Sequence, residues 1–241
     1  MNLSSIKTWV FDLDNTLYAP EEDIFSQIDK KMTSFISNHY NINSNDAFHI
    51  QKEHFLEYGT TLAGLMNDKN NNIDPDEFLR VVHDIDLQSL KSDPNLRKAI
   101  LNLSGPKFIF TNGTKRHAEN VLEKLGLDDL FESIFDIKSA NYIPKPNIET
   151  YNLFFQSTNI DPKSSIMFED MGRNLIPAKE LGMTTVLIKR EIPNKHNIFQ
   201  DKKYADIWGQ DVPADYVIDD FVKFLNNNKI NKLKLQRVKH E

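Results

Sequence analysis

The amino-acid sequence predicts an α/β fold in which a parallel sheet is interrupted by an inserted all-helical domain. Short apolar runs of strand length alternate with longer segments whose apolar residues recur at helical spacing, which is typical of βαβ units around a parallel sheet. Between the first two runs, residues 20–103 show helical patterns without a convincing strand. The length of 241 residues fits either one large domain or one domain with a smaller companion.

Six apolar runs have the length expected of buried strands: residues 8–13, 107–111, 134–137, 165–168, 184–188 and 215–218. Helical segments separate most of them. The segment before Gly126 has apolar residues at helical spacing, and glycine readily adopts the left-handed conformation that ends a helix. Residues 148–156 and 175–182 repeat this helical pattern before the next strands.

Helix start signals predict at least three helices in the insertion. Pro20 is followed by two acidic residues, and both features favour a first helical turn. Asp74 with Glu77 three residues later has the form of a capping box, and Asp93 with Pro94 opens a third helix. The expected division is a sheet domain formed by residues 1–19 and 104–241, and a helical domain formed by residues 20–103.

Composition and charge exclude several classes of protein. The absence of cysteine excludes disulfide scaffolds, thiolate metal sites and a cysteine nucleophile. The formal net charge of -6 offers no broad positive field, so we expect no nucleic-acid polymer as a partner. No secretory signal is evident and no run approaches the roughly 20 apolar residues of a membrane span, so we expect a cytoplasmic protein with no membrane partner. The basic residues at 229–239 predict a frayed, solvated terminal helix.

Two carboxylates follow the first strand and give the strongest chemical signal. In the sequence V-F-D-L-D-N-T-L-Y, Asp12 and Asp14 stand at the carboxyl end of the predicted strand, where open α/β sheets bind ligands. Side chains two apart on a strand share a face and lie roughly 6.6 Å apart. Like charges so close together favour a hard, oxygen-ligated cation such as Mg²⁺. The alternative, capping of a turn, explains one aspartate but not both.

A hydroxyl and a lysine provide two weaker signals. The second strand ends in Thr111, and the following Asn112 and Gly113 offer backbone N–H groups before a helix, a plausible cradle for phosphate. Lys145 stands between two prolines, which would deliver its ammonium group to one place. Taken alone, the first pattern is often a turn with Thr114 as a helix N-cap, and the second is often a surface turn.

A pair of adjacent acids follows the fourth strand. Glu169 and Asp170 end the run S-I-M-F-E-D, and with Asp12 they would complete an oxygen-rich metal site. In isolation, a capped helix start explains the same pattern equally well.

Taken together and in this order, the four patterns resemble the haloacid dehalogenase (HAD) superfamily, whose core is a Rossmann-like parallel sheet. The resemblance spans the whole predicted core. It implies a carboxylate nucleophile that attacks phosphorus, a second aspartate that acts as general acid and then base, and Mg²⁺ as cofactor. By position it implies the following roles: Asp12 as nucleophile, Asp14 as acid and base with its backbone carbonyl on the metal, Thr111, Asn112 and Lys145 on phosphate, Asp170 as metal ligand, Glu169 in or beside the metal shell, and Asn174 supporting the acidic loop.

The inserted helices have the position and size of the cap that selects the substrate in that superfamily. Two stretches, Y-G-T-T-L-A-G-L from Tyr58 and F-L-R-V-V-H-D-I-D from Phe78, look like the pyrimidine 5'-nucleotidase branch. Tyr58 is a candidate to stack on a base or sugar, and Thr61, His83 and Asp84 are candidates for polar contacts. For each of these residues, helix-end packing or a surface position is a strong alternative.

The expected function is therefore a Mg²⁺-dependent phosphomonoesterase that hydrolyses pyrimidine nucleoside 5'-monophosphates through an aspartyl-phosphate. Its expected partner is a small phosphorylated metabolite. The alternatives are a phosphatase for another such metabolite, a phosphomutase, a dehalogenase and a catalytically silent binding protein. A dehalogenase does not need Asp14, and a silent protein would tolerate loss of Asp12, Lys145 or Asp170, all of which are present.

Overall fold

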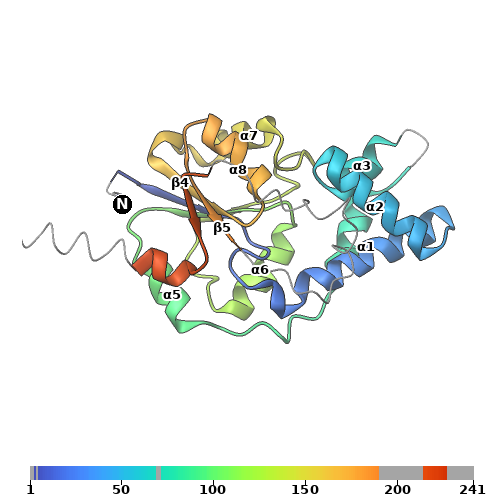
Figure 1. The fold of residues 1–241 in the computed structure, drawn as a ribbon, viewed down its shortest axis with the longest axis horizontal. Coiled ribbons are helices and arrows are strands. Elements are labelled where there is room, and N and C mark those ends of the chain that lie inside the picture. Colours follow the sequence, from blue (N-terminus) through green and yellow to red (C-terminus); the bar gives the residue numbers. More distant parts are fainter. Residues whose placement is uncertain (1–2, 4, 69–71, 190–213, 227–241) are drawn as a thin grey trace, which may run out of the picture.

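The computed structural model describes residues 3, 5–68, 72–189 and 214–226 and confirms the predicted parallel sheet. Figure 1 shows the sheet flanked by helices, with a group of helices standing beside it. Six parallel strands are arranged in the order β3-β2-β1-β4-β5-β6. Their bounds are Thr8–Phe11 (β1), Lys107–Phe110 (β2), Ser133–Phe135 (β3), Ser165–Glu169 (β4), Thr184–Ile188 (β5) and Tyr216–Ile218 (β6). The predicted basic helix at 229–239 lies outside the described residues.

Strand β1 lies at the centre of the sheet, and its four residues T-W-V-F are all buried. Phe11 is in register with Ile109 of β2 and with Phe168 of β4. Because these three strands are parallel and in register, their carboxyl ends meet at one edge of the sheet. The polar residues that follow them are therefore brought together by the register alone.

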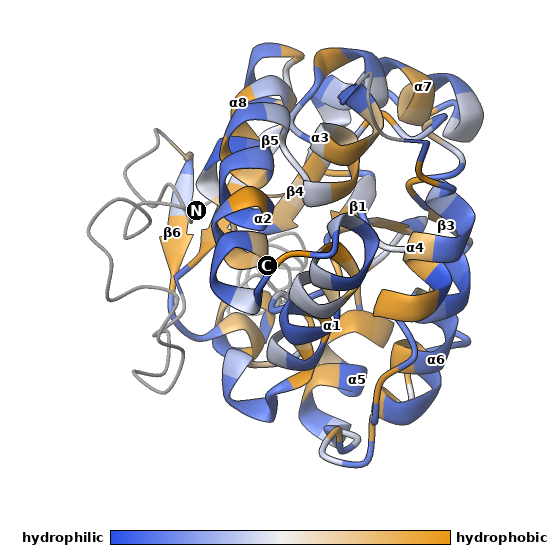
Figure 2. Ribbon diagram, turned by 90° about the vertical axis from the view of Figure 1, so that its right-hand side faces the viewer, coloured by the Kyte–Doolittle hydropathy of each residue, from blue (hydrophilic) through white to orange (hydrophobic). Residues whose placement is uncertain are grey.

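Helices cover both faces of the sheet, as βαβ connections require. On one face α7 (Ile148–Thr158) and α8 (Gly172–Glu180) pack over Val10, Phe110 and Met167. On the other face α5 (Pro94–Leu101) and α6 (Lys115–Leu125) cover a cluster that contains Trp9, Phe11 and Phe168. Figure 2 shows hydrophilic residues along one side of most helices and hydrophobic residues along the other.

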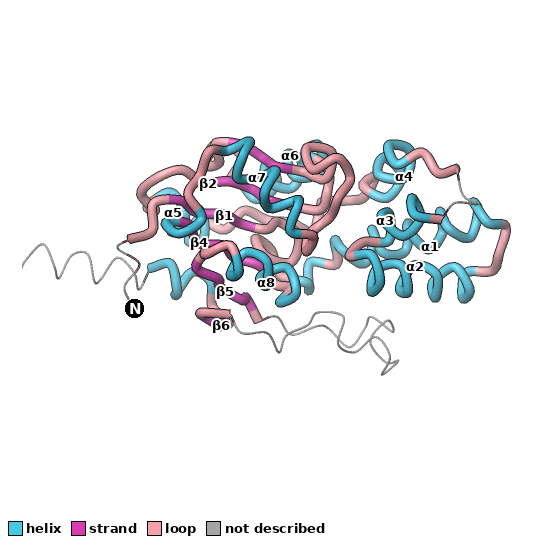
Figure 3. Tube along the Cα trace, turned by 90° about the horizontal axis from the view of Figure 1, so that it is seen from above, coloured by secondary structure: helices cyan, strands magenta, loops and turns pink. Residues whose placement is uncertain are grey.

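A separate group of helices lies at one end of the molecule (Figure 3). They are α1 (Ile24–Tyr40), α2 (Ser44–Tyr58), α3 (Thr61–Asn67) and α4 (Pro75–Val82). Their apolar side chains form a cluster of their own, which includes Ile28, Leu65 and Phe78. No helix among the described residues is long and apolar enough to span a membrane.

The first helix of the insertion does not begin at Pro20. Pro20–Glu22 forms a single 3-10 turn that ends at Asp23, whose φ of 61° breaks the helical path before α1 begins at Ile24. The sequence also did not predict α2, because its buried residues include Gln51 and Lys52 in place of an apolar stripe.

Helix α5 packs with the sheet, although the predicted helical domain extends to residue 103. Leu96, Ala99 and Ile100 belong to the same apolar cluster as the β1 residues Trp9 and Phe11. The reason is the short connection: α5 ends at Leu101 and β2 begins at Lys107, so the helix stays beside the sheet. We propose that the helical domain comprises α1–α4 and that α5 belongs to the core.

Two neighbouring residues of α5 provide a test of this packing. Ile100 is fully buried, whereas Leu101 is 58% exposed. We expect Ile100→Ala to lower the free energy of unfolding by about 2–5 kcal/mol and Leu101→Ala to change it by about 0.5 kcal/mol or less, as measured by urea denaturation. Similar losses for both variants would contradict the placement of α5.

Candidate active site

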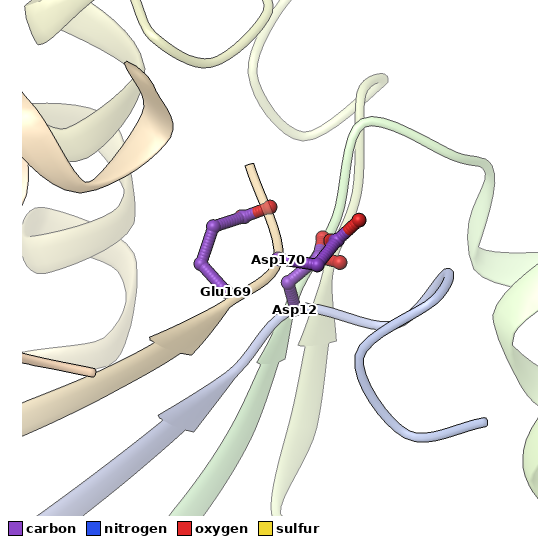
Figure 4. A group of neighbouring side chains, drawn as sticks. All are labelled: Asp12, Glu169 and Asp170. Carbon is purple, nitrogen blue, oxygen red and sulfur yellow. The ribbon is translucent and has the colours of Figure 1, made fainter. Parts of the chain in front are cut away.

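Three carboxylates meet at the edge where β1 and β4 end. Asp12 follows β1, Glu169 is the last residue of β4 and Asp170 follows it. Figure 4 shows the three side chains at adjacent strand ends. One oxygen from each lies within 4.8 Å of the others, and all three residues are buried.

Lys145 is the cation that holds this cluster together. Its side chain is 1% exposed, and its Nζ donates hydrogen bonds of 2.8 Å each to Asp12 Oδ1, Glu169 Oε2 and the backbone carbonyl of Phe110. Burial alone would lower the pKa of Lys145, but the two carboxylates outweigh burial, so the pKa is raised. The ammonium group therefore stays charged at the sheet edge.

One ammonium group does not balance three buried carboxylates. Burial and the negative charge of Glu169 raise the pKa of Asp12 to about 7, even though Lys145 opposes them. Burial, Glu169 and Asp12 likewise raise the pKa of Asp170 well above its ordinary value. Residues in this arrangement need either shared protons or a second cation.

The carboxylate oxygens of the cluster are suitable ligands for a hard divalent cation. Thr16 Oγ1 donates to Asp170 Oδ1 at 3.2 Å, but among the described residues no donor reaches the buried Oδ2 of Asp170. Leaving a buried carboxylate oxygen without a partner is costly. All the available ligand atoms are oxygens, which suits Mg²⁺. Asp12 and Asp170, with Glu169 beside them, are the residues that would hold it.

Asp14 is held by two residues that the sequence analysis did not single out. His117 Nε2 lies 2.8 Å from Asp14 Oδ1, and the hydroxyl of Tyr18 donates to the same oxygen at 2.5 Å. Burial would raise the pKa of Asp14, but these two contacts outweigh it and lower the pKa. Tyr18 closes the first quoted motif, and His117 lies three residues beyond the Thr114 N-cap of α6.

The predicted cap residue His83 reaches the site through His117. The two rings stack with centroids 4.5 Å apart, and Thr114 Oγ1 lies 3.3 Å from His83 Nδ1. Burial and the neighbouring His117 lower the pKa of His83 to about 3, so its ring is neutral. The end of α4 therefore rests directly on the residue that holds Asp14.

The structure places the predicted phosphate residues beside the carboxylates. Thr111 is buried, and its Oγ1 accepts the backbone N–H of Gly113 at 2.9 Å. The side chain of Asn112 accepts the backbone N–H of Lys145 at 2.8 Å and donates to its carbonyl at 3.1 Å, so it fixes the Lys145 backbone. Asn174 lies nearby, but no hydrogen bond reaches its buried side-chain oxygen within the described part of the chain. Its support of the acidic loop stays a prediction.

A cavity joins this edge of the sheet to the helical group. Its lining includes Asp12, Asp14, Lys145, Thr61 and His83. The other two cap candidates are not part of the lining. The ring of Tyr58 contacts His54, and the side chain of Asp84 is 87% exposed beside Lys31.

Arg173 of α8 joins the helical group to the sheet domain. Its guanidinium donates to the carbonyls of Phe55 and Gly59 at 3.2 and 2.9 Å and lies 4.0 Å from the centroid of the Phe55 ring. Gly59 in turn lies against the Lys145 carbonyl, and a Cβ there would stand 3.1 Å from it. The end of α2 is therefore fixed beside the charged cluster.

Comparison with known families agrees with this site. Residues 6–182 match the family model described as haloacid dehalogenase-like hydrolase. The chain belongs to that family. The match includes β1, β2 and β4 together with every carboxylate of the cluster.

Several known proteins are similar to this chain. It is 27% identical to Phosphate metabolism protein 8 of Saccharomyces cerevisiae over 75% of this chain and 61% of the yeast protein, so it spans about three fifths of that relative. It is 25% identical to Glyceraldehyde 3-phosphate phosphatase of Methanocaldococcus jannaschii over 83% of this chain and 91% of that protein. The magnesium-bound hydrolase YfnB of Bacillus subtilis shares the fold, with a TM-score of 0.57 at 15% identity over 93% of this chain and 99% of that one.

Stabilisation by Mg²⁺ tests the carboxylate cluster without measuring activity. A cation that binds only the folded protein stabilises it by about 2.7 kcal/mol at a hundredfold excess over its dissociation constant, or about 5–10 °C in Tm for a chain of this size. We expect that shift in the unsubstituted protein, measured by calorimetry, and its loss in Asp170→Asn. The exposed Asp129→Asn variant is the control and should keep it. A full shift in Asp170→Asn would place the cation elsewhere.

Proposed function

We propose that this hydrolase is a Mg²⁺-dependent phosphomonoesterase that works through an aspartyl-phosphate on Asp12. The observation that carries the proposal is the position of the Asp12 carboxylate. One oxygen is held by Lys145, and the group faces a cavity that also contains Asp14. The names of two relatives, one a phosphatase and one a phosphate metabolism protein, support the same class of substrate.

Asp12 attacks the phosphorus atom of the monoester, a bond forms between its oxygen and phosphorus, and the bond to the leaving oxygen breaks. Asp14 gives a proton to that oxygen, and then takes a proton from the water that attacks the aspartyl-phosphate. Lys145 and Thr111 hold the transferring group by charge and hydrogen bonding. Bound Mg²⁺ supplies neutralisation of charge on the phosphoryl oxygens.

Asp14 must carry a proton when the substrate binds, although His117 and Tyr18 favour its ionised form. A phosphate dianion beside Asp14 disfavours a second negative charge and so raises its pKa. The contacts from His117 and Tyr18 then favour return of Asp14 to the ionised form, which is the form that accepts a proton from water. His117 and Tyr18 therefore favour removal of a proton from water by Asp14 more than donation of a proton to the leaving oxygen.

The proposed substrates are pyrimidine nucleoside 5'-monophosphates. The cavity continues from the carboxylates into the helical group, where Phe25, Phe55 and Phe78 line it, so it has room and apolar surface for a planar leaving group. The archaeal relative's name makes a smaller sugar phosphate the second candidate.

The two aspartates are distinguished by a substrate whose leaving group needs no proton. With p-nitrophenyl phosphate, we expect Asp14→Asn to release one equivalent of nitrophenol rapidly and then to turn over about 10²–10⁴-fold more slowly than the unsubstituted enzyme. The first step needs no acid, but the second lacks its base. Stopped-flow absorbance measures the burst and the steady rate.

Asp12→Asn should show neither burst nor turnover, because no carboxylate is available to accept the phosphoryl group. Labelled phosphate should be recovered on acid-quenched Asp14→Asn protein and not on Asp12→Asn protein. Turnover by Asp12→Asn at the unsubstituted rate would rule out the carboxylate nucleophile.

A further inference from the structure

We propose that Asp29 and Lys52, a buried ion pair in the helical group, form the site that selects the leaving group. The pair would bind the far end of a planar leaving group that carries a hydrogen-bond donor beside an acceptor, as the amide edge of a nucleobase does. This inference rests on the proposed phosphatase function and deepens it.

The pair lies in the wall of the cavity, on α1 and α2. Asp29 is 5% exposed and Lys52 is 6% exposed, and both line the same cavity as Asp12 and Lys145. The Lys52 ammonium contacts Asp29 Oδ1 directly. It is thus a second buried lysine–carboxylate contact in the cavity, supplied by helices that contribute nothing to the sheet.

The hydrogen bonds around Asp29 leave part of the pair available. Gln51 Nε2 donates to Asp29 Oδ1 at 2.7 Å, and Thr33 Oγ1 in turn donates to Gln51 Oε1 at 2.5 Å. Both hydrogen bonds to the Asp29 carboxylate therefore use Oδ1, and in the described part of the chain no donor is bonded to Oδ2. Lys52 has three N–H groups and uses one of them on Asp29. Among the described residues, one Asp29 oxygen and two N–H groups of Lys52, whose ammonium also lies 5.2 Å from the centroid of the Phe48 ring, therefore have no hydrogen-bond partner.

Stability does not account for a charged pair in this place. Removing two charges from water is costly, and well-packed apolar residues in their place often give an equally stable or more stable protein. The neighbouring apolar residues Ile28, Leu62 and Phe78 show that this helical group can form an ordinary apolar cluster. A charged pair with unused hydrogen-bonding atoms, facing a cavity, is the arrangement expected of a ligand site.

The surroundings indicate what kind of group would bind there. Phe25, Met32 and Phe55 line the cavity beside the pair and offer flat or adaptable apolar surface. The pair is neutral overall, so a neutral group that carries both a donor and an acceptor matches it better than a charged one. Such a group leaves neither Asp29 nor Lys52 unpaired, whereas a leaving group without it does.

Two substrates with the same sugar and phosphate provide the test: uridine 5'-monophosphate carries a base, and ribose 5-phosphate does not. We expect the unsubstituted enzyme to prefer the nucleotide in kcat/KM. Lys52→Met should lower kcat/KM for the nucleotide by about 10–100-fold and leave ribose 5-phosphate within about twofold. The double variant Asp29→Asn/Lys52→Met keeps an acceptor for Gln51, leaves no buried charge unpaired and removes the ammonium donors, so it should lose the same preference if Lys52→Met fails to fold.

Lys31→Met is the matched control, because it breaks an exposed lysine–aspartate pair whose lysine lies on α1, the helix that carries Asp29. Lys31→Met should leave kcat/KM unchanged for both substrates. Equal losses for both substrates in the Lys52 and double variants would show a structural role and overturn the inference, as would no preference in the unsubstituted enzyme. Phenyl phosphate separates the two hypotheses. If the enzyme hydrolyses phenyl phosphate but does not prefer uridine 5'-monophosphate over ribose 5-phosphate, only this inference is contradicted. If it releases no phosphate from phenyl phosphate in the presence of Mg²⁺, the proposed function itself is contradicted.

Discussion

The contact between the buried Lys145 ammonium and the carboxylates of Asp12 and Glu169 is the constraint on which the site depends. Three acids cannot be buried together without compensating charge. Within the part of the chain that the structure describes, one lysine contacts these acids, and an oxygen of Asp170 has no hydrogen-bond donor. The incomplete balance of charge is the feature that would allow the proposed cation and phosphate to bind. A cluster whose charges were fully compensated by the protein would be more stable, but it would not attract a cation or a phosphate.

That balance is maintained by contacts that reach across the molecule. Asn112 fixes the backbone of Lys145, and Gly59 packs against the carbonyl of the same residue. Gly59 is itself held by Arg173 of α8, the helix that follows the acidic pair. The helical group thus closes over the charged cluster and limits the access of water, which strengthens every electrostatic interaction inside.

The sheet and its polar edge could be predicted from the sequence because both follow from local patterns. Each strand is a short apolar run, and parallel register brings the residues after those runs together. The same reasoning did not find His117 or Tyr18, because their importance comes from a contact with Asp14 that no spacing encodes. Helix α2 was missed for a related reason, since Lys52 and Gln51 occupy buried positions where a helix ordinarily carries apolar residues. The resemblance predicts Tyr58 and Asp84 as substrate contacts, but neither residue lines the cavity.

Helix α2 departs from the usual sequence pattern of a helix because polar residues occupy its buried positions. Local sequence rules describe how segments become stable, so a residue that breaks them is either strained or serves another purpose. At the sheet edge the exceptions are acids at the ends of apolar strands, and their chemistry is evident from residue type alone. In the helical group the exception is Lys52, a lysine at a buried helical position. The sequence alone predicts a surface residue there, because its partner Asp29 lies on another helix. Reaction chemistry can therefore be inferred from strand ends, whereas selection of the leaving group depends on pairs formed between helices and becomes visible only in the folded protein.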